Sequence, residues 1–404
     1  MNKKILTLYC GVPKLTKMLL PIVLLEHVVI AFCLNISAYF KKVGYFNYDL
    51  IGQFISTYYF GCLLGALIGG ILTLRFSTTK ISGIGMIFIG ADLYCLFDSL
   101  NQWLIDLLMF LLGLIGTIIA TSNISSLLRT VKEESAKLKV ISLELILFNL
   151  AFSLVSFILL DLSSKEIIQF VKYFPFILFC AGLLALIFYR DPIFVPFQHT
   201  SYNSKLFLPP KKQEFFILIS MVFCFGLIFS MVKVVFAPTL IERYGSNAIS
   251  ATIASINPWI IFFIQPLIVE RVKSTNSTCF LGCGGLIVGL SYFIFGMVSS
   301  FILTVIVLIS LTFGEMMFSP LSKHLNIQLY GQGKEGLASG IWRAVFLGSG
   351  ILGPKLSGYF AEYYGTYMVW ECCALLGLIC FTFSFFLKKI KQRALCNGII
   401  LDEI

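Results

Sequence analysis

Residues 18–40 read MLLPIVLLEHVVIAFCLNISAYF, an apolar stretch interrupted by only a few polar side chains. A helix of about twenty apolar residues is long enough to cross the hydrocarbon core of a bilayer. The stretch is too long for the apolar region of a cleavable signal peptide, and it contains Glu26, His27 and Asn35. It therefore predicts a first membrane-spanning helix that carries polar groups within its length.

Similar stretches recur along the whole chain. Of its 404 residues, 58% are hydrophobic and only 12% are charged, whereas an average soluble domain is about 25% charged. We therefore expect an all-α polytopic membrane protein with twelve transmembrane helices. The spans are expected at approximately 18–40, 50–73, 80–98, 103–127, 140–160, 172–189, 214–236, 249–269, 277–297, 301–322, 337–360 and 366–387.

The longest connection lies near the middle of the chain, from Arg190 to Gln213, and it contains four prolines and several basic residues. It divides the expected spans into six before and six after. We predict an N-terminal six-helix bundle at residues 1–189, a cytoplasmic central loop at 190–213, and a C-terminal six-helix bundle with a cytoplasmic tail at 214–404.

The basic residues are distributed unevenly between the two sides of the expected helices. Of the 30 Lys and Arg, 22 fall in the termini and the even-numbered connections, 5 in the odd-numbered connections, and 3 within or at the ends of spans. Cytoplasmic loops of membrane proteins carry an excess of Lys and Arg. This distribution predicts cytoplasmic termini, and it accounts for the net charge of +10 without a nucleic-acid partner.

Two six-span halves joined by a basic loop resemble the major facilitator superfamily, which implies two pseudo-symmetric helix bundles. Between the second and third spans, that superfamily carries a Gly-x-x-x-Asp-Arg-x-Gly-Arg pattern. The corresponding stretch here is GGILTLRFSTTK, in which Gly70 and Arg75 match. Leu74 stands at the aspartate position and Ser77 at the second glycine position, so the charge contact that the pattern implies is expected to be altered.

Other stretches resemble proton-coupled oligopeptide transporters within the superfamily. SINPWIIFFIQP contains Asn257 and Pro258, and TFGEMMFSPLS contains Glu315 and Pro320, in patterns similar to those of that family. Asn149 lies in the fifth span, where such transporters often carry an asparagine. The first span departs from the family, because only Glu26 and His27 stand where two glutamates and a basic residue are expected.

The eleventh span instead resembles proton-driven drug exporters of the superfamily. It reads GSGILGPKLSGYF, in which Gly348, Gly353, Pro354 and Gly358 are similar to the exporter pattern. The fifth span lacks the Gly-Pro pattern of those antiporters. The sequence thus resembles proton-coupled importers in some spans and proton-driven exporters in another.

Two glutamates lie near the expected middle of the membrane. An ionisable side chain at the centre of a transmembrane helix costs at least ~2.5 kcal/mol on insertion scales. Glu26 in the first span and Glu315 in the tenth belong to opposite halves, and in this superfamily both spans line the central cavity. We predict Glu26 and Glu315 as proton-coupling residues, with fixed ion pairs as the alternative. His27 follows Glu26 and is expected to point about 100° away from it on the helix.

The remaining polar residues within the spans are candidates for binding or packing. Substrate contacts are predicted for Arg343, Trp342, Asn149, Asn257 and His27, with a structural pair between Arg343 and Glu315 as an alternative. Asp92, Glu144 and Lys233 are additional intramembrane charges; Glu144 is expected to meet a loop cation, and Lys233 to extend toward the outer rim. Gly70, Arg75, Pro258 and Pro320 are expected to serve conformational change.

We therefore predict a secondary transporter, not an enzyme, that moves a small organic solute by alternating access. Proton-coupled symport of a peptide-, amino-acid- or metabolite-like solute is favoured. A proton-driven exporter of drugs or siderophore-like molecules is the first alternative, and a non-transporting receptor or scaffold is the second. No metal or cofactor pattern is present in the sequence. We expect a monomer with both termini in the cytoplasm, in the inner membrane of a bacterium.

Overall fold

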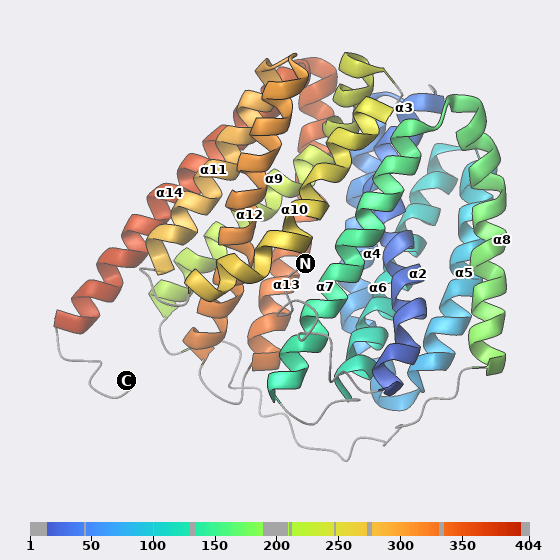
Figure 1. The fold of residues 1–404 in the computed structure, drawn as a ribbon, viewed down its shortest axis with the longest axis horizontal. Coiled ribbons are helices and arrows are strands. Elements are labelled where there is room, and N and C mark those ends of the chain that lie inside the picture. The colour runs from blue at the N-terminus through green and yellow to red at the C-terminus, as the bar shows by residue number, and fades with distance from the viewer. Residues whose placement is uncertain are drawn as a thin grey trace. The chain divides into compact units, whose positions relative to one another are not determined.

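The computed structural model describes residues 14–43, 46–99, 101–129, 134–188, 209, 212–245, 248–272, 277–330 and 335–396. Within these residues the chain forms thirteen helices and no strand (Figure 1). The helices are α2 (Lys14–Leu34), α3 (Ile36–Val43), α4 (Tyr48–Arg75), α5 (Thr78–Asp98), α6 (Gln102–Arg129), α7 (Glu134–Asp161), α8 (Ser164–Phe188), α9 (Lys212–Tyr244), α10 (Ala248–Val272), α11 (Ser277–Met297), α12 (Phe301–Tyr330), α13 (Glu335–Tyr363) and α14 (Thr366–Cys396).

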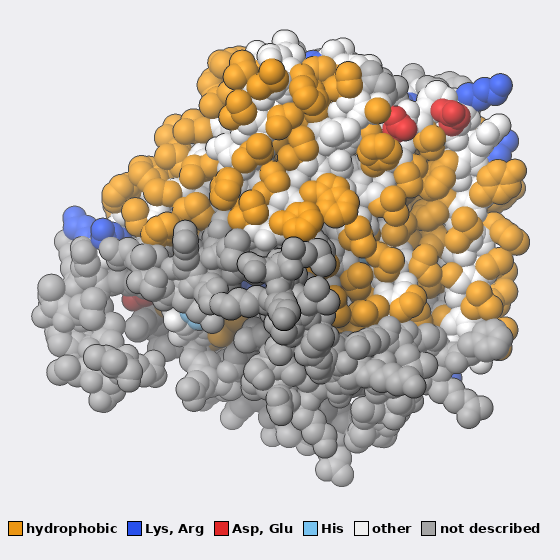
Figure 2. Space-filling view, in the orientation of Figure 1, with side chains coloured by type: hydrophobic (Ala, Val, Ile, Leu, Met, Phe, Trp, Pro, Cys, Tyr) orange, Lys and Arg blue, Asp and Glu red, His pale blue; other side chains and the backbone are white. Residues whose placement is uncertain are grey.

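The structure confirms that each predicted span is helical. Each predicted span coincides with one helix, except that α2 and α3 together form the first span, bent by 50°. Eight described helices are long and apolar enough to cross a bilayer, and the bent pair makes a ninth. Hydrophobic side chains cover much of the visible flank of the described helices (Figure 2), as a protein surrounded by lipid requires. The chain is a polytopic α-helical membrane protein.

The bend between α2 and α3 has a local cause at Asn35. Its side-chain Nδ2 donates a hydrogen bond of 2.9 Å to the carbonyl oxygen of Ala31, and its backbone N–H is shared between the carbonyls of Ala31 and Phe32. An asparagine that bonds to its own helix in this way competes with the regular backbone pattern. The bend therefore keeps its polar groups satisfied inside the apolar span.

The chain divides into two compact units. Unit 1 comprises Met1–Phe46, Gln53–Thr200 and Ala237–Pro258, and unit 2 comprises Asn47–Gly52, Ser201–Phe236 and Trp259–Ile404. Most of the predicted central loop, residues 190–213, lies outside the described residues. The domain division proposed from the sequence therefore stays a prediction.

In unit 1 the main helix pairs are α5 with α8 and α6, and α2 with α7 and α6. Glycines bring helices of this unit close together. A Cβ atom placed on Gly182 of α8 would lie 2.7 Å from the carbonyl oxygen of Gly83 on α5. Likewise, a Cβ on Gly65 of α4 would lie 2.3 Å from the carbonyl oxygen of Leu114 on α6. Small residues at helix interfaces let backbones approach in lipid, where no hydrophobic force joins the helices.

Unit 2 repeats this arrangement with different residues. Its main pairs are α11 with α14 and α12, so the third and sixth helices of each half pack together in both units. Gly289 of α11 faces Gly377 of α14, where an added Cβ would lie 2.8 Å from the partner Cα. A serine hydroxyl joins α13 to α9, because Ser357 donates a hydrogen bond of 2.8 Å to the carbonyl oxygen of Met231.

Candidate functional site

Glu26 is buried in unit 1 and held by a chain of hydrogen bonds from two other helices. Asn123 on α6 donates through Nδ2 to Oε2 of Glu26 at 2.8 Å. Ser82 on α5 donates through its hydroxyl to Oδ1 of Asn123 at 2.6 Å. Only 3% of the surface of Glu26 is exposed, and Asn123 and Ser82 are also buried. The carboxylate therefore has a fixed orientation in an environment that disfavours its charge.

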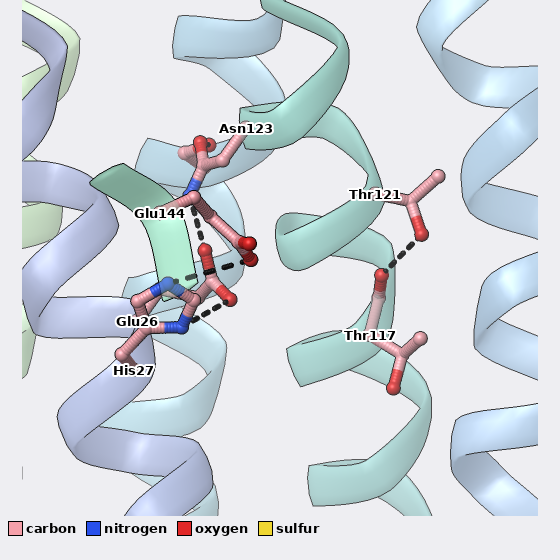
Figure 3. A network of polar contacts seen from close by, with 7 residues as sticks. Glu26, His27, Thr117, Thr121, Asn123 and Glu144 are labelled. Atoms are coloured by element: carbon pink, nitrogen blue, oxygen red, sulfur yellow. Dashed lines mark hydrogen bonds and ion pairs between the residues drawn. The ribbon is translucent and has the colours of Figure 1, made fainter. Parts of the chain in front are cut away.

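His27 lies between two carboxylates from different helices (Figure 3). Its Nδ1 is 3.4 Å from Oε1 of Glu26, and its Nε2 is 3.6 Å from Oε1 of Glu144 on α7. The expectation that His27 and Glu26 point apart was wrong, because the imidazole turns back along the helix toward its neighbour. The described ion-pair partner of Glu144 is His27, and the basic side chains of the preceding loop lie outside the described residues, so the contact of Glu144 with a loop cation stays a prediction. We call Glu26, His27 and Glu144 the acid–histidine cluster.

Aromatic and polar side chains of α7 continue this cluster along the helix. The ring of Phe148 packs edge-on against His27, with centroids 5.6 Å apart. This contact restricts the imidazole to the orientation in which it faces both carboxylates. Asn149, the next residue, is buried in the same unit. The predicted contacts Glu26, His27 and Asn149 thus lie on the paired helices α2 and α7.

In unit 2, Glu315 of α12 belongs to a second charged cluster. Its carboxylate interacts electrostatically with the Lys233 ammonium of α9 and with Tyr292 of α11. Lys233 was expected to extend toward the outer rim of the membrane. Lys233 is partly buried and interacts electrostatically with Glu315, and its extension toward the outer rim stays a prediction. Tyr292 is buried and stacks against Trp370, with ring centroids 6.2 Å apart.

Arg343 and Trp342 of α13 differ in their surroundings. Arg343 is exposed, and no described carboxylate lies within ion-pair distance of it, so the alternative of a fixed pair with Glu315 is not found. Trp342 donates through Nε1 to the hydroxyl of Ser322 at 3.1 Å and stacks on Phe346, with nearly parallel rings 5.4 Å apart. Packing thus accounts for the orientation of Trp342, whereas Arg343 is accessible.

Asp92 of α5 is a buried carboxyl group outside both clusters. Both of its oxygens are buried, and neither has a hydrogen-bond partner in the part of the chain that the structure describes. A buried carboxylate without a hydrogen-bond partner carries a large desolvation cost, which a bound proton removes.

The residues expected to serve conformational change lie within helices. Pro258 lies in α10 and Pro320 in α12, and Asn257 precedes Pro258 with its Oδ1 buried. Gly70 and Arg75 lie near the end of α4, but the surroundings of Gly70 and the side chain of Arg75 are outside the described part of the structure. Groups of three or more His, Cys, Asp or Glu that could hold a metal ion are not found among the described residues.

Two residues of the site, Asn123 and Ser82, were missed by the sequence analysis. Each is a single uncharged polar residue in an apolar span, and such residues occur in most of the spans. The one available signal was that Asn123 is an amide within the fourth span, where an unpaired polar group is costly. Its partner Glu26 is 97 positions away, which the sequence alone does not show.

The chain resembles known transporters by sequence model and by structure. A family model described as Major Facilitator Superfamily matches residues 17–330. Among solved structures, a POT family transporter in complex with 5-aminolevulinic acid has a TM-score of 0.76 and 14% identity, covering 95% of this chain and 97% of that chain. A mutant of the nucleoside transporter NupG has a TM-score of 0.74 and 14% identity, covering 93% of this chain and 99% of that chain.

A peptide transporter POT in complex with sulfate has a TM-score of 0.72 and 15% identity, covering 95% of this chain and 96% of that chain. At these identities the likeness concerns the fold alone. No curated protein matches the chain. The predicted architecture of two pseudo-symmetric six-helix bundles is confirmed by these structures.

Proposed function

Because this chain belongs to the major facilitator superfamily and is a membrane transporter rather than an enzyme, we propose that it carries a small organic solute in symport with protons. The observation that carries the proposal is the acid–histidine cluster, in which buried His27 lies between Glu26 and Glu144. Three titratable groups on two spans, α2 and α7, share one site. Such intramembrane groups are expensive to place in lipid and commonly mark proton pathways.

The charge of the acid–histidine cluster supports proton binding. With His27 protonated and both glutamates ionised, the cluster carries one net negative charge. One further proton makes the cluster neutral, which favours its burial in a medium of low dielectric constant. Asn123 holds Glu26 at 2.8 Å, so the carboxylate that receives this proton keeps a defined position. We propose Glu26 as the main coupling residue, with Glu144 and His27 sharing the proton.

Glu315 and Lys233 supply a second charged cluster on unit 2. The ammonium and the carboxylate interact electrostatically. A solute with an amino group could therefore compete with Lys233 for the carboxylate, and a solute with an acidic group could compete with Glu315 for the ammonium. We propose that Glu315 takes part in coupling and that Arg343, which is exposed, binds an anionic group of the solute. Asn149, Asn257 and Trp342 are proposed as further contacts.

This combination of positive and negative groups favours a peptide-, amino-acid- or metabolite-like solute. The similar POT family transporter is in complex with 5-aminolevulinic acid, and NupG is a nucleoside transporter. These molecules form a sensible first panel, together with free amino acids and dipeptides. Proton-driven export of a larger drug or siderophore-like molecule is the alternative, motivated by the glycine-rich sequence of α13.

The proposal is tested by uptake into proteoliposomes across an imposed pH gradient. Labelled dipeptides, amino acids, nucleosides and 5-aminolevulinic acid are offered to the intact protein. We expect one class to accumulate inside when the outside is acidic. Glu26→Gln and Glu315→Gln are each expected to abolish this accumulation and to leave solute exchange without a gradient, because the binding site is retained while proton release is lost.

Glu166→Gln serves as the matched control. Glu166 is an exposed glutamate at the start of α8 whose carboxylate accepts hydrogen bonds from the backbone and hydroxyl of Ser163. Its substitution should leave accumulation unchanged. If pH-driven accumulation survives in both Glu26→Gln and Glu315→Gln, the proposed coupling residues are wrong. Accumulation only when the inside is acidic would instead identify an exporter.

A further inference from the structure

Unit 1 contains a second site, separate from the acid–histidine cluster. A cavity of about 520 Å³ opens where α3 and α5 end and α8 begins, within the size range of small-molecule sites. Its lining includes Tyr39, Phe97, Tyr94, Asp98 and Lys172. We propose that this cavity binds the headgroup of a zwitterionic phospholipid that carries an ammonium group, with the lipid tails lying along the outside of α5 and α8.

The wall of the cavity is aromatic, and its rings contact one another. Tyr39 packs against Phe97 with centroids 5.1 Å apart, and Phe40 packs edge-on against Phe46 at 5.1 Å. All four rings line the cavity. The faces of aromatic rings attract ammonium groups, and clusters of such rings recognise choline-like ligands. The wall therefore suits the cationic end of a headgroup.

The cavity also carries one acidic and one basic side chain. Asp98, the last residue of α5, and Lys172 of α8 both line it and are both exposed. Asp98 can accept hydrogen bonds from an ammonium group, and Lys172 can bind a phosphate as a point charge. A headgroup with a phosphate and an ammonium matches both charges, whereas an anionic headgroup leaves Asp98 opposed to it.

The position of the cavity fits the headgroup region of a bilayer. Three exposed aromatic residues lie at the same end of unit 1: Tyr94 is 63%, Trp103 is 86% and Tyr173 is 70% exposed. Exposed Trp and Tyr gather where membrane meets water. In the orientation that the loop charges predict, this end lies on the non-cytoplasmic side. Figure 2 shows acidic and basic side chains over the ends of α3 and α8, above a flank of hydrophobic side chains.

The apolar surface beside the cavity distinguishes a lipid from a soluble zwitterion. Phe176, Ile177 and Leu184 of α8 are all exposed and lie farther along the helix, toward the centre of the membrane. The buried Leu96 and Val171 complete the apolar part of the lining. A headgroup held by the two charged side chains would extend its acyl chains over this surface, where a soluble solute has nothing to bury.

Lipid binding to the full-length protein in detergent tests the inference without any transport measurement. Native mass spectrometry and thermal unfolding are followed while phosphatidylethanolamine or phosphatidylglycerol of equal chain length is added. We expect phosphatidylethanolamine to bind more tightly and to raise the unfolding temperature more. Asp98→Asn and Lys172→Gln are each expected to weaken its binding roughly tenfold, because each removes one charge contact.

Matched controls come from the same end of α8. Lys165→Gln and Glu166→Gln change exposed charges close to the cavity without altering its lining, so lipid binding should be unchanged. Equal binding of both lipids, or lipid binding that is insensitive to Asp98→Asn and Lys172→Gln, would overturn the proposal. Equal stabilisation by soluble phosphoethanolamine, or displacement of the lipid by a transported solute, would assign the cavity to a soluble ligand and would also overturn it.

Discussion

Nδ2 of Asn123 donates a hydrogen bond of 2.8 Å to Oε2 of Glu26, so that α6 positions a carboxylate carried by α2. The amide is in turn fixed by the hydroxyl of Ser82 on α5. Three helices of one unit thus meet at a single proposed proton site. The orientation of Glu26 depends on residues that are not themselves titratable.

Replacing Asn123 by Ala should impair transport without changing any charge. Glu26 then loses the donor that fixes its Oε2, and small displacements of a reacting group can reduce rates by as much as ~100-fold. We expect the initial rate of pH-driven uptake to fall by at least roughly tenfold, with a smaller loss for Ser82→Ala. Ser122→Ala, at a buried hydroxyl adjacent to Asn123, is the control. Equal uptake by Asn123→Ala and Ser122→Ala would contradict a positioning role.

Two glycines of α6 should differ sharply in their tolerance of a methyl group. A Cβ on Gly113 would lie 2.0 Å from the carbonyl oxygen of Tyr58 on α4, whereas a Cβ on Gly116 meets nothing within 4 Å. Gly113→Ala should therefore destabilise the fold by about 1–3 kcal/mol, as overpacking does, and Gly116→Ala should be tolerated. Thermal unfolding in detergent measures both. A Gly113→Ala protein as stable as the wild type would argue against the close α4–α6 contact.

Lys233 and Glu315 should show energetic coupling. Removing one member of a buried charge pair leaves the other uncompensated, whereas replacing both is often neutral. We expect Lys233→Met and Glu315→Gln each to lower the unfolding temperature and the double variant to recover part of that loss. The control is a second double-mutant cycle that combines Glu166→Gln with Lys233→Met. Its effects on the unfolding temperature should be additive, because Glu166 belongs to the other unit. Additive effects of Lys233→Met and Glu315→Gln would exclude an interaction between the two.

Asp92 should tolerate loss of its charge. Its oxygens are buried without a described hydrogen-bond partner, so the neutral form is the one that suits the site. Asp92→Asn keeps the size and polarity of a protonated carboxyl group, and we expect expression and unfolding temperature to be unchanged or higher. Glu26→Gln, which disrupts the contact with His27, provides the contrasting case. An unfolding temperature well below that of the wild type would show that the Asp92 carboxylate has a stabilising partner.

The positions of the membrane helices could be predicted from the sequence. In lipid, each backbone N–H and C=O of a spanning helix must be bonded within that helix. A long run of apolar residues is therefore sufficient to predict a membrane helix. The runs at 18–40 and 50–73 therefore correspond to α2 with α3, and to α4. The break at Asn35 was not predicted, because it depends on a hydrogen bond to Ala31 that competes only weakly with the regular helix.

The types of residue at the site were also evident from the sequence, but their partners were not. Glu26, His27, Glu144, Lys233 and Glu315 stand out in the sequence because charge is costly in a membrane. Their pairing depends on how each helix is rotated about its axis and how closely it approaches its neighbours. The side chain of His27, for example, turns toward the adjacent Glu26, although consecutive residues of a helix point in different directions.

The amino-acid sequence alone was enough to predict a helical membrane transporter, the places of its helices and the intramembrane charges that need a partner. The folded chain was needed to see that His27 lies between Glu26 and Glu144 and that Lys233 interacts electrostatically with Glu315. This difference arises because helix formation in lipid is a local requirement of the backbone. The contacts between side chains depend instead on packing between helices that are distant in the sequence.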